Sequence, residues 1–179
     1  MGVMRWLADR LGGPGAPGPG GPGRQLVAHD VPPIFPYWQE THVQPLLHEL
    51  GVADADTLFG HFLRDAVVRT GNPKPRFLSL GAGDCQLELR LARAFVKSGL
   101  PEFRIDCVEP NPLLRSRARA TALGQGLDRH VVGVAADCNT WRARDRYDGV
   151  IANGSLHQVV RLERLLDEVH SAMADGARS

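Results

Sequence analysis

The spacing of hydrophobic residues changes along the chain. Between residues 43 and 69 they recur every three or four positions, which predicts helices over 43–50 and 54–69. From residue 73 onward, short apolar runs alternate with segments of helical spacing. The runs predict strands at 76–81, 104–109, 130–135 and 147–152, and the segments that follow them predict helices at 84–98, 112–124 and 160–174.

Strands that alternate with amphipathic helices form right-handed βαβ units on a parallel sheet. The pattern therefore predicts an α/β fold, a Rossmann-like parallel sheet flanked by helices. The run "ADG" at 174–176 indicates a helix end and a turn, after which a further strand is expected, whereas the chain ends at Ser179. We therefore expect a fold that is incomplete at its C-terminal side, with a sheet edge that a second copy could cover in a homo-oligomer.

Composition divides the chain into three parts. Residues 12–23 contain only Gly, Pro and Ala, which predicts a flexible linker within an N-terminal tail of residues 1–30. Residues 31–72 are expected to form a helical lid or cap. Residues 73–179 are expected to form the Rossmann-like domain.

Bulk composition argues against several kinds of partner. A formal net charge of +1 gives no reason to expect nucleic acid or a membrane surface. The N-terminus lacks the apolar core of a signal peptide, and no segment approaches transmembrane length, so a cytoplasmic location is expected. Three widely spaced cysteines and the lack of an HExxH pair predict neither a disulfide framework nor a metal site.

Candidate chemistry begins where the first predicted strand ends, at Gly81-Ala82-Gly83-Asp84. Glycines allow a tight turn and a close approach of backbone to ligand, and the following helix offers free N–H groups. A dinucleotide fingerprint needs a third glycine at position 86, where the chain has Gln86. Asp84 would repel a pyrophosphate, so a cationic or zwitterionic ligand is favoured. An ordinary tight turn remains the alternative.

The other three predicted strands also end in polar residues. Glu109 lies where an acid typically binds ribose hydroxyls, and Asp137 can accept a hydrogen bond from an exocyclic amino group such as that of adenine. Asn153 and His157 follow the fourth strand. Helix capping by Glu109, a plain turn at Asp137 and a packing role for His157 remain alternatives. Because parallel strands present their carboxyl ends to one crevice, all four groups are expected at one site.

As an ordered set, these motifs resemble class I S-adenosylmethionine-dependent methyltransferases over residues 76 to about 173. "FLSLGAGDC" is similar to the glycine-rich motif of that family, "AADCNTW" to its adenine-side acidic loop, and "YDGVIANGSLHQVV" to a later strand–loop motif. The resemblance implies S-adenosylmethionine as cofactor and cofactor contacts from ten residues. These are Ser79, Gly81, Ala82, Gly83, Asp84, Glu109, Pro110, Asp137, Cys138 and Asn153.

The resemblance also implies an enzyme that transfers a methyl group to a small-molecule acceptor. His157 is the candidate catalytic base. Tyr37 or Trp38 could face the sulfonium from a lid, or these aromatics could pack the first helix onto the sheet. The chain departs from the family at Ser79, where an acid is common, and at Cys85, where a third glycine is common.

Two other functions remain open. The chain could be a non-catalytic module that binds a nucleotide or S-adenosylmethionine without turnover. It could also be a Rossmann-type NAD(P)-binding oxidoreductase, which Gln86 and the lack of a Tyr/Lys pair disfavour.

Overall fold

The computed structural model describes residues 34–49 and 51–177, so the predicted tail 1–30 and its linker 12–23 lie outside the described residues. The chain forms two compact units, divided between Gln39 and Glu40. The first contains α2 (Ile34–Trp38), and η1 (Gln39–Val43), a π-helix, spans the division. That Tyr37 or Trp38 reaches a ligand therefore stays a prediction.

The second unit contains a four-stranded sheet. Its strands are β1 (Arg76–Leu80), β2 (Arg104–Val108), β3 (Val131–Val134) and β4 (Gly149–Ile151), and every pairing is parallel in the order β3-β2-β1-β4. This confirms the predicted Rossmann-like parallel sheet. Each strand stops one residue before its predicted end, because the chain there turns away from the sheet into the loops of the candidate site.

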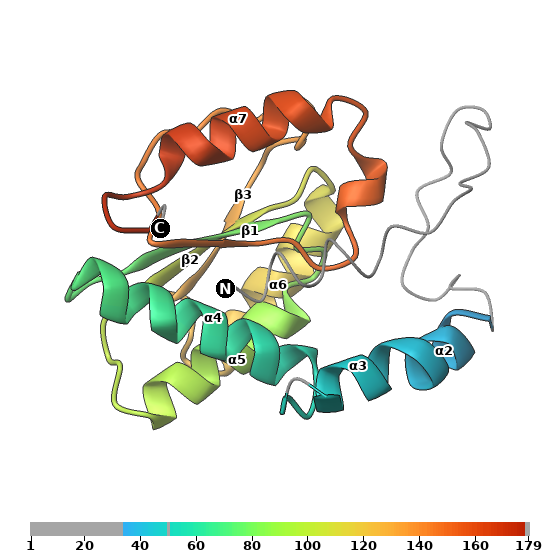
Figure 1. The fold of residues 1–179 in the computed structure, drawn as a ribbon. Coiled ribbons are helices and arrows are strands. Elements are labelled where there is room, and N and C mark those ends of the chain that lie inside the picture. Colours follow the sequence, from blue (N-terminus) through green and yellow to red (C-terminus); the bar gives the residue numbers. More distant parts are fainter. Residues whose placement is uncertain (1–33, 50, 178–179) are drawn as a thin grey trace. The chain divides into compact units, whose positions relative to one another are not determined.

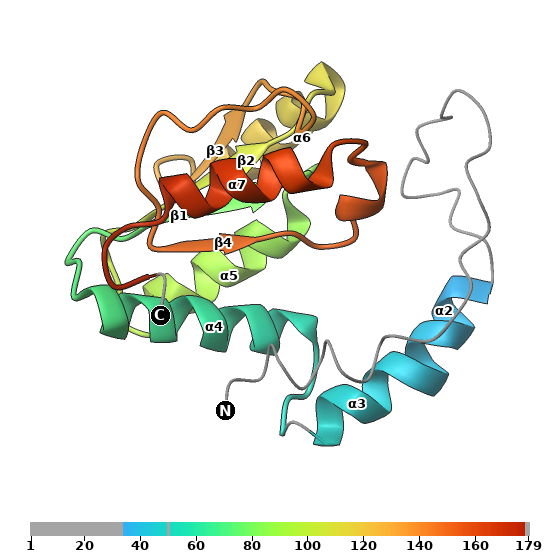
Figure 2. The ribbon, with the colours of Figure 1, turned by 45° about the horizontal axis from the view of Figure 1, so that its top comes forward.

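Helices cover both faces of this sheet, as Figures 1 and 2 show, with α7 (Leu162–Ala172) opposite α4 (Ala55–Thr70) and α5 (Gln86–Lys97). The remaining helices of the unit are α3 (Gln44–Glu49), α6 (Pro112–Gly124) and the 3₁₀-helix η2 (Leu156–Gln158). α6 closely matches the predicted helix at 112–124, and α4 lies within one residue of the predicted 54–69.

Alternation along β1 explains the two layers. Phe77 belongs to the core cluster beneath α5, whereas Leu78 and Leu80 belong to the cluster beneath α7. Successive strand residues point to opposite faces, so Ser79 points toward α5. α4 contacts β4 and α5, so it forms part of this layered unit. How the residues before α4 relate to the site stays a prediction.

Local capping also follows the sequence. Asp54 caps α4, and its Oδ1 accepts a hydrogen bond from the Thr57 N–H at 2.7 Å. Asn111 caps α6 by accepting from the Leu113 N–H at 2.9 Å. Among the described residues, no helix is long and apolar enough to cross a membrane.

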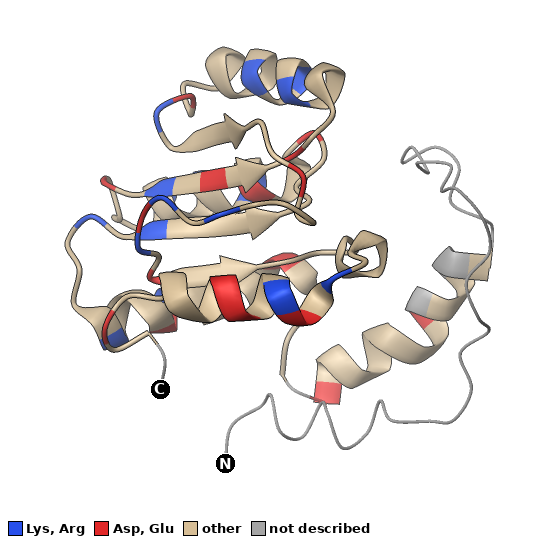
Figure 3. Ribbon diagram, turned by 90° about the horizontal axis from the view of Figure 1, so that it is seen from above, with Lys and Arg blue, Asp and Glu red and all other residues tan. Residues whose placement is uncertain are grey.

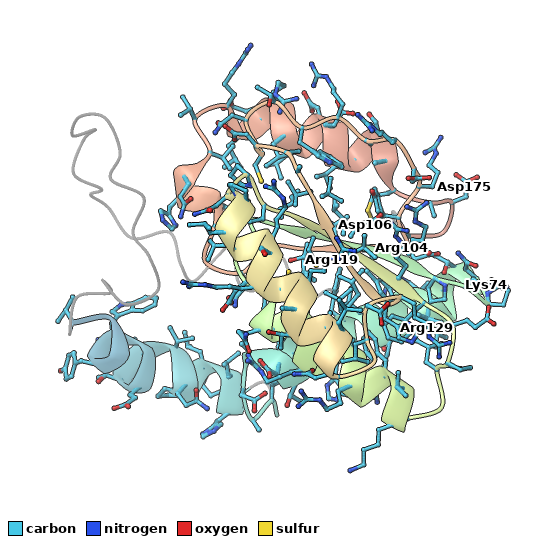
Figure 4. All side chains as sticks on the ribbon, turned by 180° about the vertical axis from the view of Figure 1, so that it is seen from behind. Lys74, Arg104, Asp106, Arg119, Arg129 and Asp175 are labelled. Atoms are coloured by element: carbon cyan, nitrogen blue, oxygen red, sulfur yellow. The ribbon has the colours of Figure 1, made fainter. Side chains whose placement is uncertain are left out.

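Charged residues join the amino ends of β1 and β2. The carboxylate of Asp106 is buried and accepts hydrogen bonds from Arg76 Nη2 at 2.8 Å, from Arg104 Nε at 2.6 Å and from the Tyr147 hydroxyl at 3.3 Å. Figure 4 labels Arg104 and Asp106 beside each other on this part of the sheet. One buried carboxylate therefore holds two strands and the segment before β4 together.

Arg76 and Arg104, the two arginines that contact Asp106, also help to line a cleft of about 410 Å³, together with Lys74 and Arg129. Most of its positive charge is paired: Lys74 contacts Glu102 at 2.7 Å, and Arg76 contacts Asp145 at 2.6 Å as well as Asp106. Figure 3 shows basic and acidic positions interspersed over this unit. The cleft lies at the end of the strands opposite the predicted ligand crevice.

We expect Tyr147 to ionise near pH 12. Burial, together with the nearby charge of Asp106, raises the pKa of Tyr147 to about 12, against about 10 in an unfolded chain. The neutral phenol is favoured by the fold, so its contribution to stability is complete below pH 10 and is lost as the pH rises toward 12. Absorbance at 295 nm should show an ionisation near pH 12 that Tyr147→Phe removes. Completion of all tyrosine ionisation by pH 11, with the fold intact by circular dichroism, would contradict this.

Candidate ligand site

The turn between β1 and α5 is built from left-handed backbone. Gly81, Gly83 and Cys85 have φ values of 67°, 60° and 59°. The N–H groups of Gly81 and Ala82 both donate to the carbonyl of Val108, at 2.9 and 3.1 Å, so the turn is tied to the end of β2. A Cβ at position 81 would lie 2.3 Å from the Cβ of Ser155. Gly81 is therefore required by conformation and by space.

Cys85 adopts a conformation that suits glycine. It is the one non-glycine residue with positive φ in the described part of the chain, and it is 2% exposed. Its thiol belongs to the core cluster beneath α5, as expected of a small buried side chain. Position 85 thus has the left-handed backbone conformation that a third glycine would adopt, although the residue is a cysteine.

Glu109 joins the glycine turn to the second strand. The carboxylate is buried, with Oε2 accepting from the Gly83 N–H at 3.0 Å and Oε1 accepting from the Asn111 N–H at 2.8 Å. Arg115, which was not among the predicted site residues, donates to the carbonyls of Glu109 and Pro110 at 2.7 and 2.6 Å. The sequence contained a signal for this role, because Arg115 lies one helical turn after Asn111, the N-cap of α6.

The loop after β3 is a compact turn. Asp137 is exposed, and its Oδ1 accepts from the backbone and the side-chain nitrogen of Asn139, at 2.8 and 3.0 Å. Burial raises the pKa of the Cys138 thiol, Asp137 adds to this rise, and a hydrogen bond with the Gly81 backbone opposes it. Cys138 therefore lies against the glycine turn, whereas Asp137 makes the contacts of an ordinary turn aspartate.

The segment after β4 contacts the same turn. Ser155 Oγ donates to the carbonyl of Leu80 at 2.5 Å, a contact that no local pattern in the sequence predicts. Asn139 Oδ1 accepts from the Val160 N–H at 2.7 Å and so connects the loops after β3 and β4. Asn153 and His157 are both exposed, and His157 lies in η2.

A cavity of about 200 Å³ opens beside the glycine turn. Among the predicted site residues it is lined by Ser79, Gly81, Ala82, Asp84 and Asn153. The other predicted residues lie outside its lining: Gly83, Glu109, Pro110, Asp137, Cys138 and the candidate base His157. Five of the ten predicted cofactor-binding residues thus line this cavity. Glu109 lies outside the lining but contacts the same turn by accepting the Gly83 N–H.

Four residues of α5 that were not predicted also line the cavity: Gln86, Leu87, Glu88 and Arg90. Glu88 is buried, and Arg90 forms an ion pair with Asp56 of α4. Burial raises the pKa of Glu88, while the hydrogen bond from Ser79 and the charge of Arg90 lower it. A signal for Glu88 was present in the sequence, because it shares the helical spacing of the buried residues Ala92 and Phe95.

No protein-family model and no curated protein matches the chain. Solved structures do resemble it. A methyltransferase from Clostridium acetobutylicum shares 17% identity at a TM-score of 0.53, covering 78% of this chain and 54% of its own. A methyltransferase from Geobacter sulfurreducens, in complex with S-adenosylhomocysteine, shares 17% identity at a TM-score of 0.52, covering 82% and 53%.

The [4+2]-cyclase SpnF resembles the chain as well, with 22% identity at a TM-score of 0.51, covering 64% of this chain and 40% of its own. The chain thus spans between two fifths and just over half of these three structures. Together they show that it has the Rossmann-like fold of class I S-adenosylmethionine-dependent methyltransferases. A cyclase among them means that this fold alone does not assign a reaction.

Proposed function

We propose that the chain binds S-adenosylmethionine at the carboxyl ends of its strands and takes part in methyl transfer to a small-molecule acceptor. The charge of the cavity beside the glycine turn carries this proposal. The carboxyl side chains of Asp84 and Glu88 line it, and the guanidinium of Arg90, which also lines it, is already paired with Asp56. Carboxylates disfavour the phosphates of a dinucleotide and favour a cationic group. S-adenosylmethionine has a sulfonium and an ammonium group and no phosphate.

The residues present fit this ligand. Among the described residues, no atom lies within 4 Å of the position that a Cβ on Gly83 would take, so a ligand can approach the backbone there. Each oxygen of Glu109 accepts one backbone N–H and keeps a further lone pair for a ribose hydroxyl. Asp137 and Cys138 would lie at the adenine, and Asn153 beside the methyl group.

When bound, S-adenosylmethionine supplies an activated methyl group on its sulfonium. The part of this chain is to align the acceptor and to exclude water, which needs no covalent intermediate with the protein. His157 is exposed in η2, in the segment that follows β4. We assign it the removal of the proton from a hydroxyl or amine acceptor.

Calorimetric titration with S-adenosylmethionine, S-adenosylhomocysteine and NAD tests the binding step. The first two should bind, and Glu109→Gln should weaken the affinity for both by about tenfold. This is the effect expected from the loss of one hydrogen bond to a charged group. The matched control is Glu102→Gln, because Glu102 lies at the opposite end of the strands and contacts Lys74. A folded chain that binds neither ligand, or that binds NAD equally well, would contradict the proposal.

A second candidate is a module that binds the cofactor without methyl transfer. It is favoured by the position of the candidate base His157, which lies outside the lining of the cavity beside the glycine turn. Binding of S-adenosylhomocysteine, with no methylated product from a panel of small amines, phenols and carboxylic acids, would support this candidate.

A further inference from the structure

Ser79 and Glu88 form a buried polar pair at the end of β1. Ser79 is the last residue of β1 that points toward α5, and Glu88 lies in the first turn of α5. The two residues are 1% and 2% exposed, and Ser79 Oγ donates to Glu88 Oε1 at 2.5 Å. One oxygen of the Glu88 carboxyl group is thereby held in place.

The second oxygen of Glu88 is buried and has no hydrogen-bond partner within the described part of the chain. Buried carboxylates usually have a cation or several donors, as Asp106 has in Arg76 and Arg104. Arg90, the nearest basic residue in sequence, is paired with Asp56 instead. A buried carboxyl group without a counter-charge does little to stabilise the fold, so its oxygen is available to a ligand.

The cavity beside the glycine turn is where such a ligand would bind, because Glu88 lines it. Ser79 and Glu88 line it together with Gly81, Ala82 and Asp84. A second carboxyl group on the same wall adds to the attraction for a cation. The volume of about 200 Å³ is large enough for an amino-acid group and too small for a whole nucleoside.

On the basis of the proposed function, we propose that Glu88 binds the α-ammonium group of the methionyl moiety through Oε2, while Ser79 holds Oε1. Ser79 stands where the resembling family often has an acid. Glu88 thus supplies from the helix a carboxylate that β1 itself lacks. It is a residue for ligand binding and specificity, and no part of the assignment requires turnover.

Binding of S-adenosylhomocysteine is to be compared with that of 5′-methylthioadenosine, which has the same nucleoside and no amino-acid group. At pH 8, Glu88→Gln should weaken the affinity for S-adenosylhomocysteine at least tenfold. The affinity for 5′-methylthioadenosine should change less than twofold. A glutamine side chain has nearly the same shape as glutamate, and the substitution removes a buried charge, so thermal unfolding should show a fold at least as stable as wild type. Glu102→Gln is the control for the substitution.

Adding Ser79→Asp to Glu88→Gln provides a second test, because it returns a carboxylate to the same wall of the cavity. This double variant should recover part of the affinity for S-adenosylhomocysteine.

The pH dependence should separate the variants as well. Four side chains act on Glu88 or feel its charge: Ser79 of β1, Asp84 of the turn, Arg90 of α5 and the thiol of Cys107 in β2. Burial raises the pKa of Glu88 above its ordinary value, so protonation on acidification should weaken S-adenosylhomocysteine binding by wild type more than by Glu88→Gln.

Three outcomes would overturn one idea or the other. If folded wild type binds neither compound, the proposed function fails. If both bind and Glu88→Gln alters neither, the proposed function stands and the assignment of Glu88 fails. If Glu88→Gln weakens both compounds equally, Glu88 acts through the shape of the turn, and the ammonium assignment is again overturned.

Discussion

Asp106→Ala is expected to lower the free energy of unfolding by about 2–4 kcal/mol. Removing one partner of a fully buried ion pair costs about 3–5 kcal/mol, because the other charge is left without compensation. Here the effect is reduced because the side chains of Arg76 and Arg104 are 30% and 44% exposed. Urea unfolding followed by circular dichroism would measure it, with an unchanged m-value as the sign that stability alone has changed.

Asp145→Ala is the matched control for Asp106→Ala. Asp145 also contacts Arg76, at 2.6 Å, but its side chain is 41% exposed. An exposed pair contributes less than about 1 kcal/mol, so this substitution should have a small effect. Equal losses for the two variants would show that burial of Asp106 is not what stabilises the amino ends of β1 and β2.

Gly81→Ala is expected to destabilise the protein by about 2–4 kcal/mol and to weaken ligand binding. The positive φ of 67° costs an alanine about 1 kcal/mol. The new Cβ would also lie 2.3 Å from the Cβ of Ser155, and such overpacking typically costs about 1–3 kcal/mol more. Denaturant unfolding and calorimetric titration with S-adenosylhomocysteine would measure the two effects.

Gly83→Ala separates the two causes. Gly83 has a similar φ of 60°, but a Cβ there meets no described atom within 4 Å. Only the conformational cost of about 1 kcal/mol should remain. Ser155→Gly should relieve part of the loss in Gly81→Ala by removing the atom that clashes. If Gly81→Ala and Gly83→Ala were equally destabilised, the contact with Ser155 would not matter.

The secondary structure followed closely from local patterns. The strand–helix alternation, the end of β1 at the glycines and the capping of α6 by Asn111 depend on residues that are neighbours in the sequence. Hydrophobic periodicity and capping chemistry act over one or two helical turns, so a single sequence contains them. β4 was the least well predicted strand, because Tyr147 forms an isolated bridge with Met173 instead of extending it.

The partners of the candidate site residues depended on the tertiary structure. Glu109 was predicted to lie near the glycine turn because parallel strands end at one edge, and its carboxylate does accept the Gly83 N–H. Its second contact, with the N–H of Asn111 at the start of α6, is local and agrees with the helix-capping alternative. For Asp137 the two interpretations differed, and in this structure the aspartate makes the contacts of a turn.

By itself, the sequence determined the order of strands and helices, the position of the glycine turn and the polar residues at the strand ends. Only the tertiary structure decided which of those residues line the cavity, and that Glu88 and Ser155 join them. Glu88 meets Ser79 because α5 packs over β1, and Ser155 meets Leu80 across 75 positions of the chain. Hydrophobic spacing indicates which residues are buried, but packing and strand register determine which buried polar groups lie within hydrogen-bonding distance.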